Sequence, residues 1–423
     1  MPNRAGPYKR HSRGIGTVIL CLALVSGSLQ TAAWAASNFK VLRSFGPGYK
    51  GGGLYSGLAV DAKGDLYSTS WGGGKNDLGT VFELRPSGQG GWKEPVLHSF
   101  DRQTDGGDPR GTLLLDGGGN LYGTTSLGGP NIDGVVFQMA HGAGGWSFTV
   151  IDDFGSHGGV IADNLGNLYG TIGPGEYNEG AVTELSSDAE RWEQTYLYSF
   201  CPKISSCPDG DAPATGVVFD SDGNLYGTTM LGGTGKGGDW GTAYELKYLP
   251  DGSWKHIVLH SFPANDGDGK LVYGGLVVDK SGNLYGTTTQ GGGSGCGGPG
   301  CGTVYELVRA GNQWKETVLY NFSNPTKGAG PISSLTFDAS GNLWGTGGGG
   351  SAQCNGGCGV VFKMTPGRRE NGSIQSHTIL AAPTANILAA AWFSTRREIS
   401  TAPPRPAAHA AMESSTGLRR KTA

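Results

Sequence analysis

Hydrophobic residues along this chain occur in short runs separated by Gly, Asp and Asn, and the central region shows no helical spacing. One stretch illustrates the pattern with four consecutive segments, residues 275–278, 283–288, 303–307 and 314–322. Each segment is rich in β-branched and aromatic residues and is bounded by turn residues, which is typical of β-strands. The pattern therefore predicts units of four short strands.

The heptapeptide GNLYGTT at residues 223–229 shows how often the unit is repeated. Its leucine recurs at intervals of 47 to 59 residues, at Leu66, Leu121, Leu168, Leu225, Leu284 and Leu343. A period of this size predicts a repeat architecture. Six units of four strands predict an all-β fold, a six-bladed β-propeller whose blades bury both faces against their neighbours. Burial on both faces explains continuous apolar runs such as residues 113–115 and 217–219.

The two ends of the repeat region predict how the ring closes. Segment 39–45, FKVLRSF, has the pattern of a fourth strand, but no unit precedes it. The last unit has no Trp-led fourth strand after Met364. We therefore expect the N-terminal strand to complete the sixth blade. A seventh blade would need residues 376–380 to start a separate sheet, and that segment is too short by itself.

The repeated unit also resembles a known family. Its pattern is D-x-x-G-N-L-Y-G-T-T-x-x-G-G, then G-T-V-Y-E-L, then W-K-x-x-V-L-Y-x-F. This pattern resembles the GloVer tandem repeat of exported bacterial proteins described as "choice-of-anchor", over residues 39–364. The resemblance implies an exported, β-propeller-like protein and no particular activity. The chain departs from the family pattern after Met364, where no familiar anchor follows.

Both termini differ in composition from the repeats. Residues 1–36 have a basic start, an apolar run at 15–25 and then Ala33, Trp34 and Ala35, which predicts a secretory signal peptide. A retained anchor is the alternative, but the run is about half of the roughly 20 residues that span a bilayer. We expect the propeller at 37–380 and a disordered tail at 381–423. The mature protein is then a secreted or cell-surface monomer without a transmembrane span, in the bacterial periplasm or outside the cell.

Charge and cysteine content narrow the possible partners. The chain has 32 Lys and Arg against 35 Asp and Glu, a formal net charge of −3, which excludes a basic nucleic-acid surface. Cys21 lies in the signal peptide. The other six cysteines form close pairs that predict disulfides in an oxidising compartment: Cys201–Cys207, Cys296–Cys301 and Cys354–Cys358. Zinc on the last four thiolates is the alternative, although their spacing is wider than a C-x2-C knuckle.

The connections at the two ends of the predicted propeller differ in length and in how closely they repeat. At one end, the connection between the first and second strands is a nearly constant Asp-x-x-Gly, as at Asp220 to Gly223. This pattern predicts a tight turn, and its likeness to a calcium loop is weak. At the other end lie the long, unequal loops 71–78, 230–240, 289–301 and 347–358. Binding usually resides in variable loops on a rigid scaffold.

The candidate ligand-binding residues belong to that second end. Acidic pairs recur in the connections between blades, at Asp105 and Asp108, Asp209 and Asp211, and Asp266 and Asp268. We expect them near the channel mouth, where carboxylates could hold Ca²⁺ or bond glycan hydroxyls, unless they only make turns. Trp71 and Trp240 are candidate contacts in the loops, whereas His98 and His260 occupy equivalent positions expected to serve packing.

Enzyme motifs are missing: the chain contains no H-E-x-x-H, G-x-S-x-G or P-loop. We therefore interpret the protein as a binding or display scaffold for a glycan or a protein partner, acting through its long loops. The alternative is a carbohydrate-active or lactone hydrolase or lyase that uses the acidic residues at the channel mouth. Beyond Ca²⁺, no cofactor is implied.

Overall fold

The computed structural model describes residues 56–381 with internal gaps at 88–90, 154, 157, 174–178, 188–190, 203–206, 214, 235–239, 264–267, 294–295, 297–299, 324–327, 348–359 and 366–376. The predicted signal peptide, the segment 39–45, Asp266, the pair Cys354–Cys358 and the tail after 381 lie outside the described residues. The described residues contain strands and no helix.

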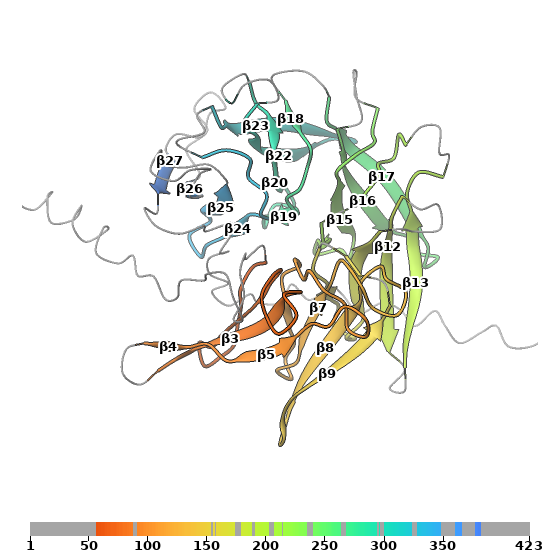
Figure 1. Cartoon of the computed structure of the whole chain (residues 1–423). Coiled ribbons are helices and arrows are strands. Elements are labelled where there is room, and N and C mark those ends of the chain that lie inside the picture. The colour runs from red at the N-terminus through yellow and green to blue at the C-terminus, as the bar shows by residue number, and fades with distance from the viewer. Residues whose placement is uncertain are drawn as a thin grey trace, which may run out of the picture. The chain divides into compact units, whose positions relative to one another are not determined.

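Apart from one two-stranded sheet in a connection, the described strands form six antiparallel sheets in chain order, and each of these six is one blade of a β-propeller (Figure 1). Blade 1 contains β1 (Ala59–Val60), β2 (Leu66–Ser70), β3 (Thr80–Pro86), β4 (Trp92–Lys93) and β5 (Val96–Ser99). Blade 2 contains β6 (Leu114–Leu115), β7 (Leu121–Thr124), β8 (Val136–Gly142) and β9 (Gly145–Asp152). Blade 3 contains β10 (Ile161–Ala162), β11 (Leu168–Ile172), β12 (Ala181–Ser187) and β13 (Trp192–Ser199).

The remaining blades follow the same order. Blade 4 contains β14 (Val218–Phe219), β15 (Leu225–Thr229), β16 (Thr242–Tyr248) and β17 (Trp254–Ser261). Blade 5 contains β19 (Val277–Val278), β20 (Leu284–Thr288), β22 (Thr303–Ala310) and β23 (Gln313–Asn321). Blade 6 contains β24 (Thr336–Phe337), β25 (Leu343–Gly347), β26 (Val360–Met364) and β27 (His377–Ala381). The predicted all-β, six-bladed architecture is confirmed.

Two blades have unusual fourth strands. In blade 1 the fourth strand is divided into β4 and β5, which both pair with β3, because Pro95 between them has no N–H to donate. In blade 6, β27 pairs with β26 from Met364↔His377 to Val360↔Ala381. The expectation that no fourth strand follows Met364 is therefore wrong, because residues 377–381 satisfy the backbone groups along the edge of β26. Ring closure by the N-terminal strand stays a prediction.

Packing between neighbouring blades is provided by the repeated aromatic positions. The Trp that begins a fourth strand meets, edge to face, the Tyr of the second strand in the preceding blade. The pairs are Tyr67–Trp146, Tyr122–Trp192 and Tyr226–Trp314. Edge-to-face pairs of this kind stabilise beyond their buried area. These Trp residues are therefore part of the scaffold, as their regular spacing predicts.

The Asp-x-x-Gly turns use the oxygens of their carboxylates in local hydrogen bonds. Asp220 Oδ1 accepts the backbone N–H groups of Asp222 and Asn224, while its Oδ2 accepts the Asn224 amide and the Tyr226 hydroxyl. Gly223 has φ +83°, the left-handed conformation that favours glycine. The same set of bonds recurs around Asp163 and Asp279. The motif GNLYGTT is thus a turn and a packed second strand.

Candidate functional site

The candidate site lies at the end of the propeller that we call the long-loop face. It comprises the connections between second and third strands and the connections between consecutive blades. Within a blade these two connections pair with each other, at Gly107↔Leu127 and Asp211↔Leu231. In blade 5 the pairing lengthens into a small sheet of β18 (Gly269–Lys270) and β21 (Gln290–Gly291). Backbone pairing therefore holds these loops in place at this face.

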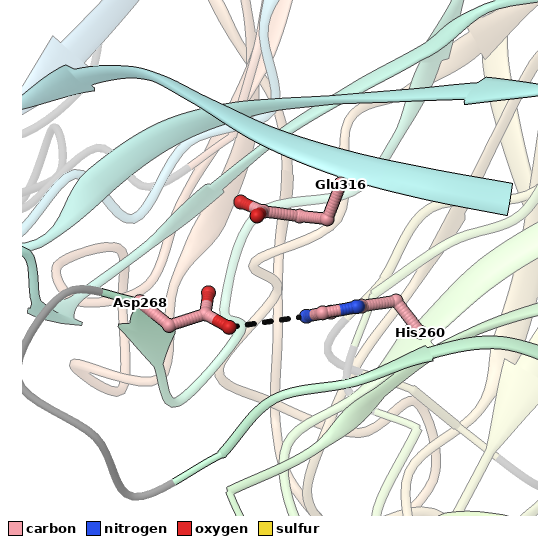
Figure 2. Close-up of side chains that lie close together, drawn as sticks. All are labelled: His260, Asp268 and Glu316. Carbon is pink, nitrogen blue, oxygen red and sulfur yellow. Dashed lines mark ion pairs between the residues drawn. The ribbon is translucent and has the colours of Figure 1, made fainter.

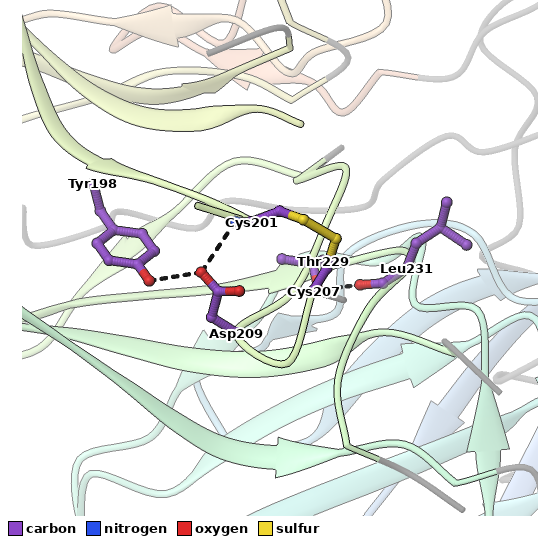
Figure 3. The surroundings of a disulfide bond; sticks show 6 residues. All are labelled: Tyr198, Cys201, Cys207, Asp209, Thr229 and Leu231. Carbon is purple, nitrogen blue, oxygen red and sulfur yellow. Dashed lines mark hydrogen bonds between the residues drawn. A yellow bond between two sulfur atoms is a disulfide. The ribbon is translucent and has the colours of Figure 1, made fainter. Parts of the chain in front are cut away.

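Two disulfides add to this pairing. Cys201 bonds to Cys207 in the connection from blade 3 to blade 4, and Cys296 bonds to Cys301 in the long loop of blade 5. Figure 3 shows the first disulfide beside Asp209, Thr229 and Leu231. The carbonyl of Cys207 accepts the N–H of Gly233, which ties the disulfide loop to the blade 4 loop. Two of the three predicted disulfides are confirmed, and zinc binding by Cys296 and Cys301 is incompatible with their disulfide.

Three of the predicted aspartates occupy one equivalent position, and each contacts a side chain on the fourth strand of the preceding blade. Asp105 Oδ2 lies 2.6 Å from His98 Nε2. Asp209 Oδ2 accepts the Tyr198 hydroxyl at 2.7 Å. Asp268 Oδ2 lies 3.3 Å from His260 Nε2. The described residues do not bring these three carboxylates into a common ligand group. Each of these carboxylates instead contacts a fourth-strand side chain, and their convergence at the channel mouth stays a prediction.

Across the boundary to the next blade, each of these pairs meets the third residue of the following Trp-led strand. His98 stacks on Phe148, with ring centroids 3.9 Å apart. Tyr198 stacks on His256, with centroids 4.2 Å apart. At the boundary between blades 4 and 5 the corresponding residue is Glu316, so that a carboxylate takes the place of a ring.

Figure 2 shows how His260, Asp268 and Glu316 face one another from β17, the connection between blades 4 and 5, and β23. One ligand atom from each residue lies within 4.8 Å of the others. Asp268 Oδ1 accepts the N–H of Gly269 at 2.7 Å, which turns Oδ2 toward the imidazole. Among the described residues, this is the one group of three His, Cys, Asp or Glu side chains with the spacing of a metal site.

The cluster places two carboxylates beside a single imidazole in a largely buried environment. The His260 and Asp268 side chains are only 21% and 12% exposed. Burial, together with the Asp268 carboxylate, raises the pKa of Glu316 to about 7, and His260 acts in the opposite direction. Glu316 Oε1 and His260 Nε2 are both buried without a hydrogen-bond partner. The contact of His260 Nε2 with Asp268 has the distance of an ion pair but not the direction of a hydrogen bond. The cluster thus combines negative charge with unused ligand atoms.

The other predicted site residues have separate surroundings. Asp108 forms an ion pair with Arg110, whose Nη2 lies 2.8 Å away, and also accepts the Ser126 hydroxyl. Asp211 is half-buried at the pairing with Leu231. Trp240 packs against the hydrophobic core between blades 4 and 5, with Lys270 Nζ 5.4 Å from its ring centroid. Trp71, by contrast, is 43% exposed.

Sequence reasoning missed Glu316 and His256. A sequence pattern could have found them, because the leading Trp of these strands repeats while the third position differs between blades: Glu94, Phe148, Gln194, His256 and Glu316. Trp240 could also have been assigned to the core. It stands two residues before the third strand, where Leu78 and Cys301 stand in blades 1 and 5, and both of these pack in hydrophobic clusters.

Exposed apolar side chains gather on the long-loop face. Of the eight large hydrophobic residues exposed in the described part of the chain, five belong to its connections: Trp71, Leu127, Ile132, Leu231 and Tyr273. Tyr273 is 44% exposed just before the innermost strand of blade 5. At the same place in blade 2 stands Arg110, whose side chain is 40% exposed. Aromatic, apolar and polar groups are thus presented together on paired loops.

The fold and its repeated sheets define this chain as a β-propeller repeat protein. A family model described as the Gloeobacter/Verrucomicrobia repeat matches residues 25–238 and again residues 158–385. The chain belongs to this family, which confirms the resemblance found in the repeated motif. No helix in the described residues is long and apolar enough to cross a membrane.

Several solved structures are similar to this chain at low identity. PorZ, a surface component of the type-IX secretion system of Porphyromonas gingivalis, is 14% identical, with 80% of this chain and 43% of PorZ covered and a TM-score of 0.46. An ulvan lyase of a polysaccharide lyase family is 11% identical, with 75% and 80% covered and a TM-score of 0.46. A protein from Lactobacillus plantarum is 14% identical, with 76% and 83% covered and a TM-score of 0.44. The comparison with curated proteins gave no match.

Proposed function

We propose that this protein is an exported glycan-binding scaffold that holds its ligand on the long-loop face. The observation that carries the proposal is the concentration of exposed apolar side chains there, with Trp71 and Tyr273 as aromatic platforms. Sugars present apolar C–H faces that pack on aromatic rings and hydroxyls that bond to neighbouring polar groups. Export is supported by the disulfides Cys201–Cys207 and Cys296–Cys301, which persist in oxidising compartments.

The scaffold suits binding because the described parts of the presenting loops are held by backbone pairing and by disulfides. Backbone pairing and the two disulfides fix these parts before a ligand arrives, so that less conformational freedom is lost on binding. The same arrangement would suit a protein partner. We favour a glycan because the exposed groups include two aromatic side chains together with the Arg110 side chain.

A glycan array probed with the purified protein tests this proposal. We expect binding to a restricted set of glycans and a loss of at least about fivefold in affinity for Trp71→Ala or Tyr273→Ala, since truncating an interface anchor costs more than about 1 kcal/mol. Leu165→Ala is the matched control, because Leu165 is 67% exposed but lies in a turn at the opposite end of the propeller.

Two outcomes would overturn the proposal. The first is a protein that binds no glycan on the array, and the second is binding that Trp71→Ala and Tyr273→Ala leave unchanged. Incubating bound glycans with the protein, followed by mass spectrometry of the products, tests the hydrolase or lyase alternative. Cleavage would replace the scaffold by an enzyme, and intact glycans would support the scaffold.

A further inference from the structure

We propose that His260, Asp268 and Glu316 form a binding site for one divalent transition-metal ion, with Zn²⁺ as the representative ion, at the boundary between blades 4 and 5. The three side chains come from two neighbouring fourth strands and the connection between them (Figure 2). Fourth strands are the outermost strands of their blades, so the site lies away from the central channel.

The distances suit a small cation. Zn²⁺ binds imidazole nitrogen and carboxylate oxygen at about 2.0–2.2 Å, which places two ligands of a tetrahedral site about 3.4 Å apart. His260 Nε2 and Asp268 Oδ2 are 3.3 Å apart. All three ligand atoms lie within 4.8 Å of one another, so a small rotamer change of Glu316 completes the set.

The chemistry of the ligands selects the type of ion. One imidazole and two carboxylates suit Zn²⁺ and related transition metals. Ca²⁺ takes 6–8 oxygen ligands, so an imidazole is a poor ligand for it. With three protein ligands, a tetrahedral ion keeps one position for water or for an oxygen of a ligand.

Two observations independent of the ligand types point to the same ion. Glu316 Oε1 and His260 Nε2 are buried and have no hydrogen-bond partner. Buried polar atoms of this kind normally have a partner, and a metal ion would supply it to both. Moreover, two of the equivalent boundaries are closed by ring stacking, through Phe148 on His98 and His256 on Tyr198, whereas Glu316 places a carboxylate at this position. A carboxylate in place of a ring needs compensation by positive charge.

The repeat itself provides a matched control. Glu316→Phe reproduces at this boundary the residues of the boundary between blades 1 and 2, where His98, Asp105 and Phe148 meet. This variant removes a ligand and introduces a ring that the fold already accommodates elsewhere. Glu316→Gln is the second variant, which keeps the shape of the side chain and removes its charge.

The experiment is isothermal titration of Zn²⁺ into the full chain after treatment with a chelator, with the melting temperature followed in parallel. We expect one ion per chain and a higher melting temperature. Both Glu316 variants should bind more than about 10- to 100-fold more weakly, since that factor is lost when only a hydrogen-bonded neighbour of a ligand is removed. Co²⁺ in place of Zn²⁺ should give the intense visible absorption of a four-coordinate ion in the native protein alone.

The proposal is overturned if the native protein binds no Zn²⁺. It is equally overturned if both variants bind Zn²⁺ as tightly as the native protein does, because the ion then lies elsewhere. Circular dichroism confirms that each variant is folded. The site does not depend on the proposed glycan binding, so a negative glycan array leaves this result unaffected.

Discussion

The imidazole of His256 in β17 stacks on the phenol ring of Tyr198 in β13, with ring centroids 4.2 Å apart and planes inclined by 9°. This contact joins blades 3 and 4 at the position where Phe148 joins blade 2 to blade 1. A residue that can be protonated thus performs a packing task that an apolar ring performs elsewhere. The stability of this boundary should therefore depend on pH.

We predict that acid weakens the native protein more than the His256→Phe variant. Burial lowers the pKa of His256 to about 4 from 6.5, while Asp209 acts in the opposite direction. The unfolded chain therefore takes up the proton first. The contribution of neutral His256 to the free energy of unfolding is complete above pH 6.5. It is lost as the pH falls toward about 4, and the total loss is on the order of 2–3 kcal/mol.

Urea unfolding of both proteins between pH 7 and pH 4 measures this difference. His141→Phe serves as the control for the substitution itself, because His141 is an exposed histidine on β8. An identical loss of stability in native protein and His256→Phe would contradict the prediction.

We predict that Gly227→Ala destabilises the fold by about 1–3 kcal/mol, the usual cost of overpacking a core. A Cβ at Gly227 would overlap the ring of Tyr244, which is completely buried on the adjacent strand. Gly117→Ala is the control, since a Cβ there meets no atom within 4 Å. The midpoints of urea unfolding compare the two variants, and equal midpoints would show that blade 4 adapts to the added methyl group.

We predict that Asp220→Ala costs roughly 1–3 kcal/mol, because two backbone N–H groups and the Tyr226 hydroxyl lose their acceptor. Asp222→Ala in the same turn should change stability by less than about 0.5 kcal/mol, since Asp222 is exposed. Melting temperatures measured with millimolar Ca²⁺ and with a chelator show whether the Asp220 motif is a structural turn or a calcium-binding loop. A calcium-dependent melting temperature that both substitutions abolish would favour the calcium loop.

We predict that Phe148→Glu creates a second metal site, because it places a carboxylate beside His98 and Asp105, whose Nε2 and Oδ2 are already 2.6 Å apart. Phe148 is half-buried, so the change should lower the stability of the metal-free protein. Zinc titration should then give two ions per chain instead of one. A single ion in the folded variant would show that the boundary between blades 1 and 2 cannot adopt the geometry proposed for Glu316.

Much of the fold could be predicted because the same residue types recur at the same positions of each repeat. Leu225 and Tyr226 recur with the period of the blade, so each blade confirms the others, and the Asp of each turn is followed by its Gly. The fourth strand of blade 6 could not be predicted in the same way. Residues 377–381 have neither the leading Trp nor the terminal Phe, and only their place beside β26 makes them a strand.

The candidate site could be predicted only in part. Sequence reasoning grouped Asp266 with Asp268, yet the position of Asp268 before its turn matches those of Asp105 and Asp209. The contacts of these residues cross from one blade to the next, so that the partner of Asp268 is found both on β17 and on β23. Pairs of this kind are separated by a whole repeat, and no local pattern connects them.

By itself, the sequence determined the number of blades, the turns, the cysteine pairs Cys201–Cys207 and Cys296–Cys301, and the end of the propeller that carries the long loops. These features depend on backbone conformation and on the alternation of apolar and turn residues, which short stretches of sequence specify. Only the tertiary structure decided that Glu316 faces His260 and Asp268, and that Phe148 stacks on His98. Those contacts form when neighbouring blades pack, because packing brings together side chains that are far apart in the sequence.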